Sequence, residues 1–238
     1  MVARLDAYSH SSGQCDILAQ EAHPFSIIGI PPERARSVFY PPDAQVPEAL
    51  RTDEFLVRPL RATDVILDYD AVISSRAELL LASGGTWPRE GFTLEENLAD
   101  LERHEQEHRE RVAFTYTVMN PAETECLGCI YINPLLHIIG KDAVNSKYLS
   151  DRTAYVNFWV RHSRLADHLD RRLLQAFIPW FQNEWAFLHV LFFAQNIEEH
   201  YIRLYEEMGL RFLYSLRPRQ PFLDIASAYL LEPNIVRS

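Results

Sequence analysis

The stretch over residues 154–209 constrains the fold most, because its apolar pattern alternates between strand and helix. Large apolar and mixed side chains alternate over residues 155–160, which is typical of a strand. Apolar residues then recur every four positions from Leu169 to Phe181, which predicts a helix. The apolar run at 188–194 predicts a buried strand, and a second helical stripe over 197–208 ends at a glycine. The stretch therefore predicts a β-loop-α-β-α unit.

A polar loop over residues 161–167 connects the first strand of this unit to its first helix. The first N–H groups of a helix have no partner within the helix, and the positive end of the helix dipole lies at the same place. This arrangement favours an anion. The unit therefore predicts an anion-binding site at the carboxyl end of its first strand.

The rest of the chain adds strands and helices in a mixed order. Strands are predicted at 55–60, 112–119, 127–132, 210–216 and 224–231. One helical region is predicted to begin with Thr63 as its N-cap, and a second to begin with a capping box formed by Thr93 and Glu96. The order predicts an α+β domain over residues 51–238, with a mixed sheet and helices on its faces.

Residues 1–50 differ from the rest and are predicted to form a proline-rich N-terminal extension. Six prolines in its second half prevent helix and central strand; they are Pro24, Pro31, Pro32, Pro41, Pro42 and Pro47. The segment is interpreted either as an arm that lies extended over its own or a partner's domain, or as a mobile tail.

Composition restricts the possible environments and partners. The net charge of −10 argues against sequence-independent binding of nucleic-acid phosphate. Three cysteines form no disulfide framework, which favours a reducing compartment. The first 13 residues lack the apolar core of a signal peptide, and no apolar run reaches the roughly 20 residues that cross a bilayer. The sequence predicts a cytoplasmic protein without membrane or nucleic-acid partners.

Three segments, in this order and spacing, resemble the GNAT superfamily of acyl-CoA-dependent N-acyltransferases. They are Phe-Leu-Val-Arg-Pro-Leu at 55–60 followed by Ala-Thr-Asp at 62–64, Phe-Trp-Val at 158–160, and Tyr-Glu-Glu-Met-Gly-Leu at 205–210. The second is similar to the branch that acetylates ribosomal-protein amino termini. The resemblance covers roughly residues 52–232 and implies a central mixed, mainly antiparallel sheet with helices on both faces.

The resemblance also implies a reaction and a site. In the family, the loop after the central strand wraps the pyrophosphate of acetyl-CoA, and an amine attacks the thioester where two parallel strands separate. It implies Tyr205 as the general acid that protonates the leaving thiolate, with a small-molecule or peptide amine as acceptor. The implied acetyl-CoA-binding residues are Val160, Arg161, Arg164, Ala166, Asp167, His168, Leu169, Asp170 and Asn196. The predicted acceptor-binding residues are Tyr131, Asn133, Asn157 and Trp159.

The loop departs from the family pattern, because every glycine of that pattern is replaced over residues 165–170. Glycine permits close approach of the backbone to phosphate, and Asp167 and Asp170 add repulsion. Four arginines near the loop either meet phosphate or pair with Asp167, Asp170 and solvent; they are Arg161, Arg164, Arg171 and Arg172. No general base is evident on the central strand. The alternative is therefore a non-catalytic binding or dimerisation protein that keeps the fold but has lost acetyl-CoA binding; a homodimer is compatible with either.

The segment from His104 to His108 matches the H-E-x-x-H pattern of zinc peptidases. The two histidines would share one helix face, with the intervening glutamate to activate water. However, the surrounding residues are almost all charged, and the third histidine of metzincins is missing nearby. The motif is therefore interpreted as part of a solvated charged helix, with a zinc hydrolase as a minor alternative.

Cys126 and Cys129 match the C-x-x-C pattern at the start of a predicted strand. In a regular strand, residues three apart point to opposite faces. A redox pair also requires a helix N-terminus to lower the thiol pKa, and a structural zinc requires further ligands. The pair is therefore predicted to be ordinary packed cysteines, and no metal site is predicted.

Overall fold

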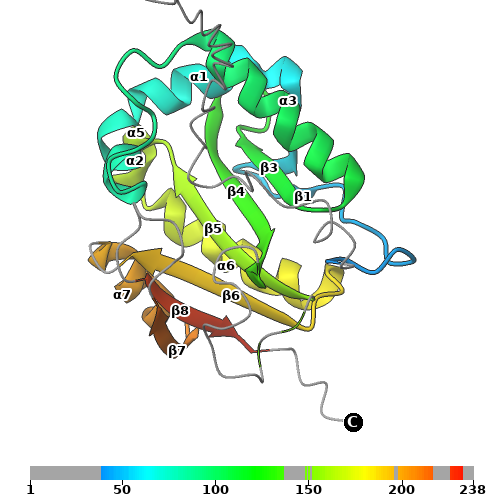
Figure 1. The fold of residues 1–238 in the computed structure, drawn as a ribbon. Coiled ribbons are helices and arrows are strands. Elements are labelled where there is room, and N and C mark those ends of the chain that lie inside the picture. Colours follow the sequence, from blue (N-terminus) through cyan, green and yellow to red (C-terminus); the bar gives the residue numbers. More distant parts are fainter. Residues whose placement is uncertain are drawn as a thin grey trace, which may run out of the picture.

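A single mixed sheet organises the computed structural model (Figure 1), which describes residues 39–136, 148, 150, 152–195, 198–216 and 226–232. Within these residues, eight strands lie in the order β1-β2-β3-β4-β5-β6-β8-β7. They are β1 (Leu50–Arg51), β2 (Leu56–Pro59), β3 (Phe114–Met119), β4 (Cys126–Pro134), β5 (Thr153–Val160), β6 (His189–Gln195), β7 (Arg211–Leu216) and β8 (Ala226–Leu231). Only β5 and β6 are parallel among the described pairs. The predicted mixed, mainly antiparallel sheet is confirmed.

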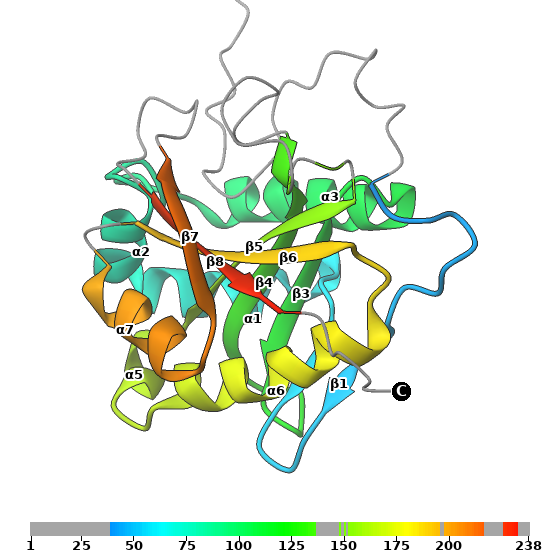
Figure 2. The same ribbon diagram turned by 90° about the horizontal axis from the view of Figure 1, so that it is seen from below.

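Helices cover both faces of the sheet, as predicted (Figure 2). They are α1 (Val65–Ser74), α2 (Arg76–Ala82), α3 (Leu94–Glu110), α5 (His162–Leu165), α6 (Leu169–Glu184) and α7 (Glu199–Glu207), with a 3-10 turn η1 at Ala62–Asp64. One face packs Phe177 and Trp180 of α6 and Leu204 of α7 against the central strands. The other packs Ala71 of α1 and Leu101 of α3 against β4 and β5. In the described part of the chain, no helix is both long enough and apolar enough to cross a membrane.

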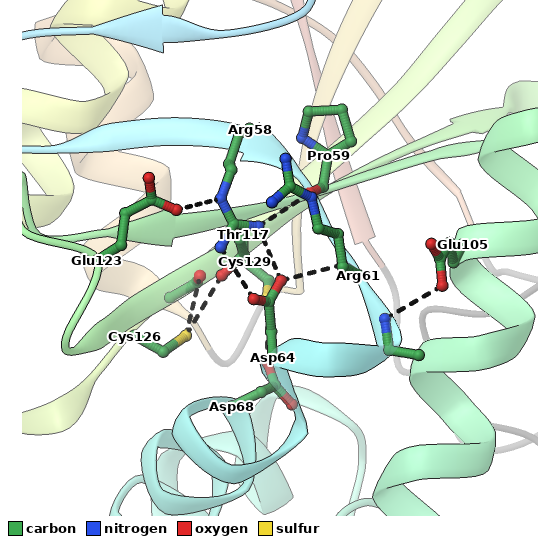
Figure 3. Close-up of polar contacts among 12 residues, drawn as sticks. Arg58, Pro59, Arg61, Asp64, Asp68, Glu105, Thr117, Glu123, Cys126 and Cys129 are labelled. Carbon is green, nitrogen blue, oxygen red and sulfur yellow. Dashed lines mark hydrogen bonds and ion pairs between the residues drawn. The ribbon is translucent and has the colours of Figure 1, made fainter.

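The first helical region does not begin with Thr63 as its cap, so this prediction is wrong. Thr63 lies inside η1, and the acceptor at this turn is Asp64, whose carboxylate accepts from the Arg61 N–H at 3.0 Å. The same carboxylate accepts two bonds from the Arg58 guanidinium, at 2.8 and 2.9 Å, and Arg58 also reaches Glu123 (Figure 3). A buried bidentate ion pair therefore fixes the turn after β2, which a hydroxyl cap does not provide.

The predicted capping box at the start of α3 is confirmed. The Thr93 hydroxyl accepts from the Glu96 N–H at 3.2 Å, and the Glu96 carboxylate accepts from the Thr93 N–H at 2.8 Å. Two N–H groups that the helix itself leaves unpaired are thereby satisfied.

Replacing Thr93 with alanine is expected to lower the free energy of unfolding by about 1 kcal/mol, because one first-turn N–H then loses its acceptor. Urea denaturation of the purified protein measures this change. Thr93→Ser is the control, since it keeps the oxygen and should cost only a few tenths of a kcal/mol. Equal losses in the two variants would show that the hydroxyl bond is not the stabilising contact.

The second half of α3 is not fully solvated, which corrects the prediction for the H-E-x-x-H segment. His104 is buried, and its Nδ1 lies 3.1 Å from the Thr115 hydroxyl oxygen. The His108 ring packs against Phe114 and Tyr116, and burial lowers its pKa to about 4. Both histidines face the sheet because α3 lies across β3. Neither belongs to a metal-ligating group among the described residues.

Cys126 and Cys129 do not point to opposite faces, so that prediction is also wrong. The β3–β4 register shifts between Val118 and Met119: Met119 pairs with Cys126 and Val118 with Gly128. Leu127 is thus an extra residue in β4, which is the definition of a β-bulge. Across the bulge a spacing of three brings side chains to one face, and the two thiols come together.

The described part of the predicted N-terminal extension packs on its own domain. Phe39 and Tyr40 are buried, and the Tyr40 ring meets those of Phe114 and Trp185 edge-on. The Tyr116 hydroxyl donates to the Pro47 carbonyl at 2.5 Å. Residues 39–50 therefore cover one end of the aromatic core. The earlier prolines lie outside the described residues.

Candidate active site

The two parallel strands separate toward their carboxyl ends. β5 and β6 pair from Thr153 with His189 to Val156 with Phe192. Beyond that point, the described pairs join β5 only to β4 and β6 only to β8. The sheet thus opens along the last four residues of β5 and the last three of β6. The backbone edges that face this opening have no strand partner there.

Buried polar groups lie on both strands at this opening. The rings of Tyr155 and Phe193 contact each other at a tilt of 60°, with centroids 4.6 Å apart, and Asn157 and Gln195 follow them by two residues on the same face. Both amide side chains are buried, and the oxygen atom of each has no hydrogen-bond partner within the described residues. A buried carbonyl oxygen without a donor costs free energy. These two oxygens therefore suit a ligand that brings N–H donors into the opening.

Glu198 is a carboxylate beside the same opening that sequence reasoning missed. Its Oε2 accepts from the Gln195 N–H at 2.7 Å, which holds the side chain at the end of β6. Burial raises the pKa of Glu198 to about 7, partly offset by that hydrogen bond. A carboxylate with this pKa exchanges protons near neutral pH, as a general base must. The sequence-based prediction considered a base on the central strand, whereas Glu198 directly precedes α7.

Tyr205, the predicted general acid, reaches β6 from α7. Its hydroxyl donates to the Phe193 carbonyl at 3.3 Å, on the part of β6 that has left β5. Its ring packs among Phe192, Tyr201 and Tyr229. Burial raises the pKa of Tyr205 well above its usual value, so the phenol keeps its proton at neutral pH. The buried hydroxyl donates its proton to a backbone carbonyl at the opening, and its catalytic role stays a prediction.

The loop after β5 is a short helical turn. Val160 ends β5, and the Arg161 N–H donates to the Leu127 carbonyl at 2.7 Å. Within the loop, the Arg164 N–H donates to the Arg161 carbonyl at 2.8 Å, and the His168 N–H donates to the Leu165 carbonyl at 3.0 Å. The loop therefore uses several of its own N–H groups internally.

The free donors lie one turn later, at the head of α6. His168 precedes this helix with a left-handed φ of 55° and provides no side-chain cap. Among the described residues, no acceptor meets the N–H groups of Leu169, Asp170 and Arg171. These three donors and the positive end of the helix dipole lie where the sequence predicts an anion site, and their role in binding stays a prediction.

The four arginines around the loop are all paired with carboxylates. The pairs are Arg161–Asp70 at 2.6 Å, Arg164–Glu125 at 2.5 Å, Arg172–Glu54 at 2.5 Å and Arg171–Glu207. The arginines are thus paired, but the predicted partners Asp167 and Asp170 are wrong, because the carboxylates that hold them come from distant parts of the chain. Asp170 is buried and pairs with His200. An incoming phosphate must therefore compete with carboxylates that already hold these charges.

Two cavities flank the head of α6. One, of about 330 Å³, is lined by His168, Asp170, Arg171, His200, Arg203, Leu204 and Glu207. The other, of about 260 Å³, lies on the side of β2 and β4 and includes Arg164, Asp167 and Arg172. The first cavity is shared by α6 and α7, next to the three free N–H groups. Its basic side chains pair with carboxylates, Arg171 with Glu207, His200 with Asp170 and Arg203 with Glu199, so a phosphorylated ligand would have to compete for them.

The predicted acceptor residues share one face of β4 and β5. Tyr131 lies opposite Asn157, and Asn133 lies opposite Tyr155. The Trp159 indole N–H donates to the Tyr131 hydroxyl at 3.3 Å. All four predicted residues are buried, with Tyr131 and Trp159 in the core beneath α1 and α3. Their role in binding stays a prediction, and Asn196 lies outside the described residues.

Comparisons with known proteins identify solved structures that share this architecture. No family model and no curated protein matches the sequence. Among solved structures, the ribosomal-protein-S5-alanine acetyltransferase from Vibrio fischeri is similar, with a TM-score of 0.60 and 12% identity over 81% of this chain and 100% of that one. The ribosomal L7/L12 alpha-N-protein acetyltransferase in complex with coenzyme A matches with a TM-score of 0.60 and 13% identity, over 77% of this chain and 97% of that one.

A third similar structure is the microcin C7 self-immunity acetyltransferase in complex with acetyl-CoA and AMP, with a TM-score of 0.58 and 9% identity over 75% of this chain and 92% of that one. Another is an acetyltransferase of the GNAT family from Bacillus anthracis, with a TM-score of 0.55. The chain therefore has the GNAT acetyltransferase fold. Within that fold, several similar structures are ribosomal-protein acetyltransferases, the branch that the sequence resembles.

Proposed function

We propose that this protein is an acyl-CoA-dependent N-acyltransferase that transfers an acetyl group to a primary amine. This proposal depends on the separation of β5 from β6 and on the buried oxygens of Asn157 and Gln195 beside it, which have no partner among the described residues. A packed structural protein gains nothing from leaving two buried acceptors unpaired. The alternative, a binding module that has lost acetyl-CoA, leaves these acceptors without a purpose.

The residues at the opening fit acetyl-CoA, which supplies the acyl group as a thioester. The N–H groups of Leu169–Arg171 would hold its pyrophosphate, and Arg203 and His200 would face its nucleotide half from α7. Asn157 and Gln195 would accept hydrogen bonds from its amide groups. Because Arg171 already pairs with Glu207, phosphate has to displace a carboxylate, and binding should weaken steeply with added salt.

Two side chains of this protein can transfer the protons that the reaction requires, one from the amine and one to the thiolate. A primary amine is protonated at neutral pH and must lose a proton before it can attack. Glu198, with a pKa of about 7, is the base beside the opening that can accept this proton. Tyr205, which stays protonated, can donate to a departing thiolate.

The acceptor class follows from charge and from the similar structures. The chain has a net charge of −10, which favours a cationic or neutral acceptor over an acidic one. Two of the similar structures are named for ribosomal proteins whose amino terminus they modify. We therefore expect an exposed peptide amino terminus or a small amine as acceptor.

Isothermal titration with acetyl-CoA tests the binding half of the proposal. We expect micromolar to submillimolar binding that weakens about tenfold in Arg203→Ala, because Arg203 lines the cavity between α6 and α7. Arg109→Ala, an exposed arginine on α3 outside that cavity, is the matched control. Absence of binding at millimolar acetyl-CoA would favour the non-catalytic alternative.

Replacing Tyr205 with phenylalanine is expected to lower kcat by about 10²-fold, at the low end of the range for general acids. The effect is limited because a thiol has a pKa near about 8.5 and its thiolate already leaves readily. Acetyl-CoA affinity should change little, since the ring packing is kept. Thiol release with a peptide amine measures kcat, and unchanged turnover would remove Tyr205 from the acid role.

A further inference from the structure

Three side chains that can ligate a metal converge under α1, away from the candidate active site. They are Asp68 of α1 and Cys126 and Cys129 of β4, and their ligand atoms all lie within 4.8 Å of one another. All three residues are buried, with exposed fractions of 3%, 0% and 1%. Figure 3 shows the helix-borne carboxylate beside the two cysteines of the strand. The bulge at Leu127 is what brings both thiols to this side.

One distance in this cluster matches the ligand spacing of a zinc site. Zinc lies about 2.3 Å from a thiolate sulfur and about 2.1 Å from a carboxylate oxygen, so tetrahedral geometry separates a sulfur and an oxygen ligand by about 3.6 Å. Cys129 Sγ lies 3.5 Å from Asp68 Oδ1. The Thr117 hydroxyl oxygen lies 3.6 Å from Cys126 Sγ and borders the cluster, where a water would take the fourth position.

The carboxylate is already oriented for such a role. The Asn97 side-chain N–H donates to Asp68 Oδ2 at 2.9 Å from α3, and Asn97 is itself 1% exposed. This bond occupies one oxygen of Asp68 and leaves the other directed at Cys129. Ligands in metal sites are commonly fixed by an outer hydrogen bond of this kind.

The neighbouring Arg58 does not replace a cation at this cluster. Arg58 lies two strands from Cys129 in the same row of the sheet, with Thr117 between them. Its guanidinium is held by Asp64 and Glu123. Two cysteines and an aspartate, buried together, gain most from a cation when they are ionised.

We propose that Asp68, Cys126 and Cys129 bind one thiophilic divalent cation of the zinc class. The ion would tie α1 to β4 from within the core. The helix it fixes is followed directly by Ser75, whose hydroxyl accepts from the His162 N–H at 3.0 Å. The metal would thus support the turn that follows β5, whether or not the protein is an acetyltransferase.

The test uses the full-length protein, with metal content measured after purification in zinc and Co²⁺ used as an optical probe. We expect about one zinc per chain, and a thiolate-to-cobalt absorption band on titration with Co²⁺. Cys126→Ser and Cys129→Ser should each abolish the band. Cys15→Ser, the third cysteine of the chain, is the matched control and should leave it unchanged.

Asn97→Ala separates a metal site from packed thiols, because it removes no ligand. We expect it to weaken Co²⁺ binding by about 10–100-fold while the thiolate band persists at saturation. The titration of the unaltered protein decides the matter even if a cysteine variant fails to fold. Fully reduced protein that binds no Co²⁺ overturns the proposal, as does zinc that remains in both cysteine variants. A mass lower by two hydrogen atoms, indicating a Cys126–Cys129 disulfide, overturns it too.

Discussion

Replacing Gly128 with alanine is expected to lower the free energy of unfolding by about 4 kcal/mol, near the upper end for a single substitution. A Cβ at this position would lie 2.1 Å from the Trp159 carbonyl oxygen, and 3.1 Å from both the Trp159 carbonyl carbon and the Val160 Cα. These are backbone atoms of β5, so no side-chain rotation can relieve the overlap. The φ of +154° adds a conformation that residues with a Cβ rarely adopt. β4 and β5 would have to move apart.

Gly85→Ala is the matched control for this experiment. Gly85 also has a left-handed φ, of +84°, but a Cβ there meets nothing within 4 Å. It should therefore lose only about 1–2 kcal/mol, the backbone cost alone. Urea denaturation of both variants under one set of conditions gives the two values. Equal losses in the two variants would mean that β4 and β5 lie further apart at Gly128 than the 2.1 Å between an added Cβ and the Trp159 carbonyl oxygen implies.

The close approach at Gly128 also shows where sequence reasoning stops. The strands over 114–119, 126–134 and 153–160 could be predicted, because alternation and β-branched residues are local signals. The bulge could not, since it depends on the register between two strands. The faces of Cys126 and Cys129 depend on that register, so the prediction that they point to opposite faces is wrong, although both are buried, unbridged thiols.

The same limit applies to α3 and to the loop after β5. A run of charged residues predicts a solvated helix, yet the path of α3 across β3 buries His104 and His108. Partners of the loop arginines lie far along the chain, at Glu54, Asp70 and Glu207. The helix N-terminus at the head of α6, where an anion site is predicted, could be located because it requires only a strand, a loop and a helix in sequence.

Glu198 is the functional candidate whose removal should reduce transfer most. We expect Glu198→Gln to lower kcat/KM at pH 7 by about 10³-fold, within the range for general bases. Glutamine keeps an oxygen that can accept the Gln195 N–H, so the end of β6 should stay in place. Removing the acid that would protonate the leaving thiolate, Tyr205, should lower the transfer rate less, because the amine cannot attack until it has lost its proton.

The pH profile separates a lost base from a damaged fold. Because burial raises the pKa of Glu198 to about 7, the base is protonated and inactive below that pH. Ionisation of Glu198 should therefore raise the transfer rate of the unaltered protein about tenfold per pH unit up to about pH 7. Deprotonation of the amine adds a second rise in the rate, up to about pH 8. The pH profile of Glu198→Gln should show only the rise that comes from the amine.

Stability provides the independent control. Its dependence on pH has the opposite sign to that of activity: stability falls as the pH rises, whereas activity increases. A carboxyl whose pKa is raised by folding binds its proton more tightly in the folded state, so it destabilises the fold as the pH rises through about 7. Glu198→Gln removes this cost, and the variant should be no less stable than the unaltered protein at pH 8. Glu199→Gln, at the exposed next residue, should change neither profile. A Glu198→Gln variant that keeps the rise up to pH 7 would show that another group takes the amine proton, and the reaction would then have to be assigned to a base outside the opening between β5 and β6.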